Sequence, residues 1–104
     1  MITKNDVLNK ISNFNCTIDA EKIKFSGILQ EVNGNIVLNA MVSVDQYQKM
    51  LSSADFNILG SIFGKEATLI GCHIHSMSGS MGSNDVSLLI IPSEIIVGKC
   101  FVSI

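Results

Sequence analysis

The sequence predicts an α+β protein that is mostly β, with an antiparallel sheet or a small, partly open barrel of about six strands and one or two short helices. Three observations predict this class. Apolar and polar residues alternate over long stretches, an Asn33-Gly34 pair separates two of these stretches, and the 104 residues suffice for a single domain with one core, residues 1–104. With 47% hydrophobic and only 15% charged residues, the chain does not have the composition of a disordered protein.

The first segment predicts a short helix over about residues 3–14. Thr3 can serve as the N-cap, and Asp6 stands three residues later as the acidic partner of a capping box. Four apolar residues then follow at helical spacing: Val7, Leu8, Ile11 and Phe14.

A β-hairpin is predicted over residues 22–43. Asn33-Gly34 favours a type I′ turn, because both central residues of that turn need a positive φ. On the first strand Ile23, Phe25, Gly27 and Leu29 share a face, and on the second Ile36, Leu38, Ala40 and Val42 lie opposite Asn35, Val37, Asn39 and Met41.

Residues 44–54 predict a short helix capped by Ser43, with a structured loop as the alternative. A second hairpin is predicted over residues 56–76, turning at Gly64-Lys65. On its return strand strict alternation places Thr68, Ile70, Cys72 and Ile74 on one face and Ala67, Leu69, Gly71, His73 and His75 on the other.

The C-terminal third predicts a loop and two strands. Residues 76–85 are rich in serine and glycine and predict a flexible loop. The runs 86–91 and 95–104 are rich in β-branched residues and predict a terminal pair of strands, with Pro92 in the turn or edge position between them.

Compartment and membrane association follow from what the sequence lacks. No apolar run reaches the ~20 residues of a spanning helix, and the first residues do not resemble a signal peptide. The three cysteines, Cys16, Cys72 and Cys100, predict reduced, buried thiols rather than a disulfide framework. We therefore expect a cytoplasmic protein with no membrane partner.

The basic residues argue against a nucleic-acid partner. All seven are lysines, so the guanidinium group that commonly recognises phosphates is absent. One tyrosine and no tryptophan leave no evident platform for stacking bases.

His73 and His75 form the one spacing in the sequence that is typical of a metal site. On a regular strand they project from the same face, ~6.5–7 Å apart, which lets two imidazoles share an ion. The third ligand has to come from elsewhere, for example Glu66, Asp85 or Glu94. The alternative is that both histidines lie at the polar end of an amphipathic strand, and no cofactor is then predicted.

Other candidate sites are weaker. Cys72 and His73 face opposite sides of a strand, and Cys100 lies in a strand-like run, so thiol catalysis is not expected. Gly79 and Gly82 lead into a strand rather than a helix, which disfavours a phosphate loop. Met77 and Met81 predict an adaptable interaction loop, unless they fold back onto the sheet.

One stretch has a family resemblance. Residues 58–72 combine a strand that ends near Gly60, a Gly64-Lys65 turn and a strand containing Thr68, Leu69 and Cys72. Together with residues 25–29 and 95–98, this order resembles the N-terminal β-rich domain of ApeA-type abortive-infection proteins, over residues 23–100. The resemblance implies a sensing or regulatory module of a bacterial phage-defence system. It carries over no functional residue, and the arginine-containing ribonuclease motif of the family's HEPN domain is absent.

The sequence therefore predicts a non-catalytic protein-interaction or sensing module. Its apolar surplus predicts an exposed patch, covered by a homo-oligomer or by a partner domain. Two alternatives stay open: a metal-binding small β-barrel enzyme that uses His73 and His75, and a structural subunit of a homo-oligomeric assembly.

Overall fold

The computed structural model describes residues 3–53, 55–79 and 82–102, which form one antiparallel sheet of eight strands and two short helices. The mostly β, antiparallel class is confirmed, with eight strands in place of about six. The elements are α1 (Lys4–Val7), β1 (Ile11–Ile18), β2 (Glu21–Val32), β3 (Asn35–Ser43), α2 (Val44–Leu51), β4 (Phe56–Ile62), β5 (Lys65–Gly79), β6 (Asp85–Ile91), β7 (Glu94–Val97) and β8 (Cys100–Val102).

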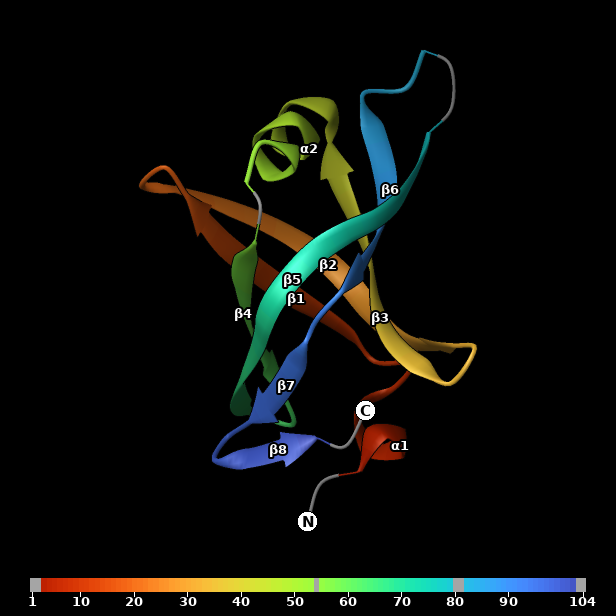
Figure 1. Cartoon of the computed structure of the whole chain (residues 1–104), viewed down its shortest axis with the longest axis vertical. Helices are drawn as coiled ribbons and strands as arrows, with labels where there is room; N and C mark the ends of the chain where they lie inside the picture. The colour runs from red at the N-terminus through yellow and green to blue at the C-terminus, as the bar shows by residue number, and fades with distance from the viewer. Residues whose placement is uncertain (1–2, 54, 80–81, 103–104) are drawn as a thin grey trace.

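Six strands close into a ring in the order β4-β1-β2-β3-β6-β5, because β4 also pairs with β5 (Figure 1). β7 and β8 extend the sheet from β5. The ring is not a regular barrel. β1 pairs with β2 along its whole length, but with β4 only from Phe14 to Cys16. The ring therefore has one short seam, between β1 and β4.

The hairpin predicted over residues 22–43 is confirmed as β2 and β3. Asn33 and Gly34 have φ values of 53° and 85°, as a type I′ turn requires. The predicted inward faces of both strands are buried, and Leu29 pairs directly with Leu38, which is 0% exposed. Alternation and turn chemistry agree here, so the sequence specifies the register.

The two helices lie at opposite ends of the ring (Figure 1). α2 confirms the predicted helix within 44–54. It ends at Leu51, and residue 54 lies outside the described residues. Ser43 and Gln46 form its capping box, and its one fully buried side chain, Met50, belongs to the core. Val7 of α1 is also buried in the core.

The helix predicted over residues 3–14 is wrong after Val7. The capping box of Thr3 and Asp6 is present, but Leu8 and Asn9 form a turn in which Asn9 has a φ of 63°. Residues 11–18 then form β1, whose inward side chains are Phe14, Cys16 and Ile18. Helical spacing of the apolar residues is overridden here because β1 gains pairing on both edges, with β2 and with β4.

The hairpin predicted over residues 56–76 is confirmed as β4 and β5, although the turn is Phe63-Gly64 and β5 continues to Gly79. The predicted faces of β5 hold from Ala67 to Ile70 but are wrong from Cys72 on. Pairing with β4 shifts register next to Gly71, which has a φ of 62°. The extra residue puts Cys72 inward with Ala67 and Leu69. A second register shift, on the β6 side, lies between Ile74 and Ser76.

The C-terminal predictions need three corrections. Residues 76–79 of the predicted 76–85 loop belong to β5, while residues 80–81 lie outside the described residues. β6 confirms the strand at 86–91, but it does not pair with the following strand. β6 and β7 lie end to end along β5, separated by Pro92 and Ser93. The predicted 95–104 strand is divided into β7 and β8 by a turn at Gly98, and residues 103–104 are outside the described part.

Helix length also bears on membrane association. In the described part of the chain the longer helix, α2, has 8 residues, and neither helix is long and apolar enough to span a bilayer.

Candidate interaction surface and ligand pocket

The outward face of the ring carries a strip of exposed and half-buried apolar residues over β1, β2, β3 and β6. Strand register places Ile11 opposite Ile28, Ile28 opposite Asn39, and Asn39 opposite Leu89. Met41 lies in the neighbouring row and is 51% exposed, while Ile11 is 81% exposed. We call Ile11, Ile28, Met41 and Leu89 the outer strip.

The outer strip borders a shallow groove of about 310 Å³ that contains no charged side chain. The groove is lined by Ile11, Ser26, Gly27, Ile28, Asn39, Met41 and Ser87. The hydroxyl of Ser87 donates to Met41 Sδ at 3.9 Å, so even this polar group is turned toward the strip. Depletion of charge around exposed apolar residues is typical of the centre of a protein–protein interface.

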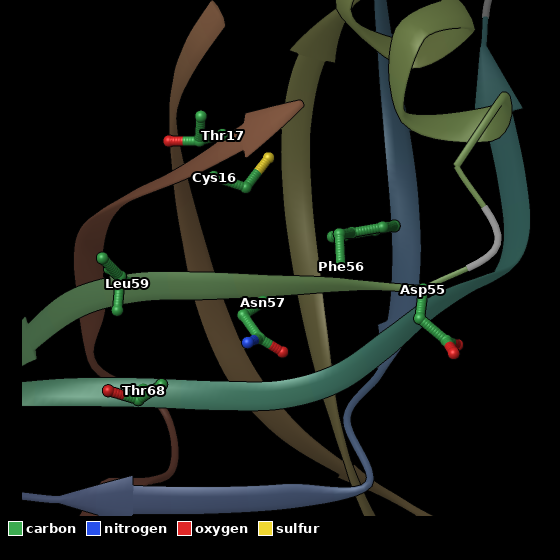
Figure 2. A pocket seen from close by; sticks show the side chains of 7 residues that line it. All are labelled: Cys16, Thr17, Asp55, Phe56, Asn57, Leu59 and Thr68. Atoms are coloured by element: carbon green, nitrogen blue, oxygen red, sulfur yellow. The ribbon is translucent and has the colours of Figure 1, made fainter. Parts of the chain in front are cut away.

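A second feature is a pocket of about 580 Å³ where β1 and β4 separate (Figure 2). Their pairing ends at Cys16 and Ile58, and Thr17 does not pair with Asn57. β1 continues along β2, and β4 continues along β5 to the Phe56–Cys72 pair. Both strands therefore keep their other partners while the edges that face each other come apart.

The pocket has an apolar floor and a polar rim. Cys16 and Phe56 are buried, Leu59 is 43% exposed, and the rim holds Thr17, Asp55, Asn57 and Thr68. The Gly71 N–H donates to Asn57 Oδ1 at 3.0 Å, which fixes the amide and leaves its NH₂ group as a donor. Asp55 is the charged residue of the lining, and neither ion pair among the described residues includes it.

The cysteines are placed partly as the sequence predicts. Cys16 and Cys72 are buried, but Cys100 is exposed, so the expectation that it is buried was wrong. β8 is a short strand at the end of the sheet and pairs, among the described residues, with β7 alone, which leaves Cys100 outside the core. Burial raises the pKa of the Cys16 thiol to about 11 and that of Cys72 to about 12, the latter helped by Cys16 itself. Both thiols are thus protonated and unreactive at neutral pH.

His73 and His75 are exposed on β5. The register shift between Ile74 and Ser76 interrupts the strict alternation on which the metal-site argument depended. Among the described residues, no group of three or more His, Cys, Asp or Glu side chains lies close enough to hold a metal ion. In that part of the chain, neither Glu66, Asp85 nor Glu94 completes a triad with the histidines.

The two methionines of the predicted interaction loop have different outcomes. Met77 belongs to β5 rather than to a loop; it pairs with Leu88 and is 46% exposed. Met81 lies outside the described residues.

Sequence reasoning missed both the outer strip and the pocket. Met41 was predicted on the outward face of its strand. Ile11 was assigned to a helix, so the sequence did not predict that it lies beside Ile28 in the sheet. The pocket depends on where two strands separate, 40 residues apart in sequence at Thr17 and Asn57, and no local pattern encodes this.

Comparisons with known proteins give no relative: no family model, no curated protein and no solved structure matches this chain.

Proposed function

We propose that this protein is a non-catalytic protein-interaction module whose outer strip docks on a second copy of the chain. The observation that carries the proposal is the group of exposed and half-buried apolar residues in two neighbouring rows across four strands, with no charge in the groove beside it. A second copy is the favoured occupant because two uncharged strips can meet without like-charge repulsion.

The chemistry of the described residues supports a non-catalytic role. Two of the three thiols are buried and protonated at neutral pH, and the two histidines are exposed without a third ligand among the described residues. We propose a cytoplasmic setting, because reduced cysteines suit that compartment. A role in a bacterial phage-defence system is proposed on the family resemblance of residues 23–100 alone.

The experiment is light scattering on the full chain across a dilution series. We expect the wild type to be a dimer that dissociates on dilution, and Met41→Lys to raise the dimer Kd at least about tenfold, since it places a charge within the interface. Leu51→Lys is the matched control, because Leu51 is 57% exposed on α2, away from the strip.

Two results would overturn the proposal of a second copy. One is a wild-type monomer at every concentration, which leaves a different partner domain as the occupant of the strip. The other is equal weakening by Leu51→Lys and Met41→Lys, which places the interface elsewhere.

A further inference from the structure

We propose that the pocket between β1 and β4 binds a short extended peptide that carries an apolar residue next to a basic one. This site is separate from the outer strip: the pocket and the groove beside the strip share no lining residue. The inference therefore goes beyond the proposed function and does not rest on it.

The strand edges define the first part of this ligand. β1 and β4 stop pairing after Cys16 and Ile58, so the backbone groups of Thr17 on β1 and of Asn57 on β4 face the pocket without a strand between them. Strand edges present N–H and C=O groups at regular spacing, which an extended peptide matches with its own backbone. Since each edge offers the backbone groups of one residue, the ligand needs only a short extended stretch.

The lining defines the side chains of the ligand. Phe56 and Cys16 are buried at the floor, and Leu59 is 43% exposed at another part of the lining, so an apolar side chain has the surface of Leu59 to cover (Figure 2). Asp55 lies at the rim as the charged residue of the lining, which favours a lysine or arginine over an acidic residue. The free NH₂ group of Asn57 and the hydroxyl of Thr17 supply further hydrogen bonds at the rim.

The size of the pocket agrees with such a ligand. About 580 Å³ lies within the ~300–1,000 Å³ range of sites for small ligands. The amide of Asn57 is also held in place by the Gly71 N–H, so one donor of the rim is positioned before the peptide arrives.

The test is a titration of the ¹⁵N-labelled full chain with the probe acetyl-Thr-Val-Lys-Val-Thr-amide, followed by amide chemical shifts. We expect the shifts to concentrate at Thr17, Ile18 and Asn57. Replacing the second valine of the probe by proline removes a backbone N–H and should weaken binding at least about tenfold. Replacing its lysine by glutamate should weaken binding by a smaller factor.

Two protein variants separate charge from general surface effects. Asp55→Asn should weaken binding of the lysine probe about threefold, which is the range of an exposed ion pair. The same variant should not weaken binding of the glutamate probe. Asp85→Asn is the matched control, since Asp85 is an exposed carboxylate at the start of β6 outside this pocket.

Three results would overturn the inference: no shift at millimolar probe, shifts confined to other strands, or a proline probe that binds as well as the parent. The Met41→Lys variant distinguishes a failure of the peptide site from a failure of the proposed dimer. If the peptide site is correct, this variant binds the probe as the wild type does, whether or not the chain dimerises.

Discussion

β2 and β5 are the two longest strands, with 12 and 15 residues, and they differ in how regularly they pair with the neighbouring strands. β2 pairs with β1 and with β3 without a register shift. β5 pairs with β4, β7 and β6 in turn, and its register shifts twice, next to Gly71 and between Ile74 and Ser76.

The difference shows how the ring closes. A strand with strict alternation keeps one face inward along its whole length, as β2 does from Ile23 to Leu29. β5 has to leave β4 and continue along β6, and each extra residue bends the strand and increases its twist. The bulges are therefore the local feature that lets one strand serve three neighbours.

The largest expected effect comes from the regular region. Leu38→Ala should lower the free energy of unfolding by about 2–5 kcal/mol, because Leu38 is 0% exposed opposite Leu29. Urea denaturation measures this. The exposed Val32, on the same hairpin, is the control, and Val32→Ala should cost no more than about 0.5 kcal/mol. Equal losses at the two positions would contradict the assigned inward face.

The bulge in β5 is tested by Gly71→Ala. Gly71 has a φ of 62°, and a Cβ there would lie 2.9 Å from Ser93 Oγ. We expect a loss of about 1–3 kcal/mol in unfolding free energy, since backbone strain and a close contact add together. Gly34→Ala shares the positive φ, but nothing lies within 4 Å of its Cβ, so it should cost less. The reverse order would argue against the bulge.

The comparison of these strands also explains what sequence alone could predict. The β2–β3 hairpin was predictable because alternation and the Asn33-Gly34 turn agree. On β5 the bulges depend on which strand lies on each edge, so alternation assigned Cys72 to the wrong face. β1 was mistaken for a helix because the spacing from Val7 to Phe14 suits a helix, and its strand pairing is made with residues more distant in sequence.

Thiol reactivity tests the inward position of Cys72. At pH 8 an aromatic disulfide reagent should titrate one thiol per chain rapidly, that of exposed Cys100, and the other two only after unfolding. Folding raises the pKa values of Cys16 and Cys72 above 9.0, to about 11 and about 12. Their contribution to stability is thus fully present below pH 9 and is lost as pH rises toward 11 and beyond. Rapid reaction of two thiols in the Cys100→Ser variant would contradict these positions.

The smallest effect is expected where α2 meets β2. Lys49 Nζ lies 2.5 Å from Glu21 Oε2, and both side chains are about half exposed. Lys49→Ala should therefore cost at most about 1 kcal/mol in unfolding free energy. Lys22→Ala, at an exposed lysine of β2 that belongs to neither ion pair among the described residues, should change it less. Thermal denaturation of both variants at low and high salt measures this difference. A loss of stability in Lys49→Ala that does not depend on salt would count against the ion pair.

The most direct test of the outer strip is methyl NMR of the full chain over a dilution series. We predict that the methyl resonances of Ile11, Ile28 and Met41 move together with concentration, while that of Leu51, on α2, stays fixed. Concentration-independent resonances at the strip, or movement at Leu51 instead, would contradict the proposal that this face binds a second copy.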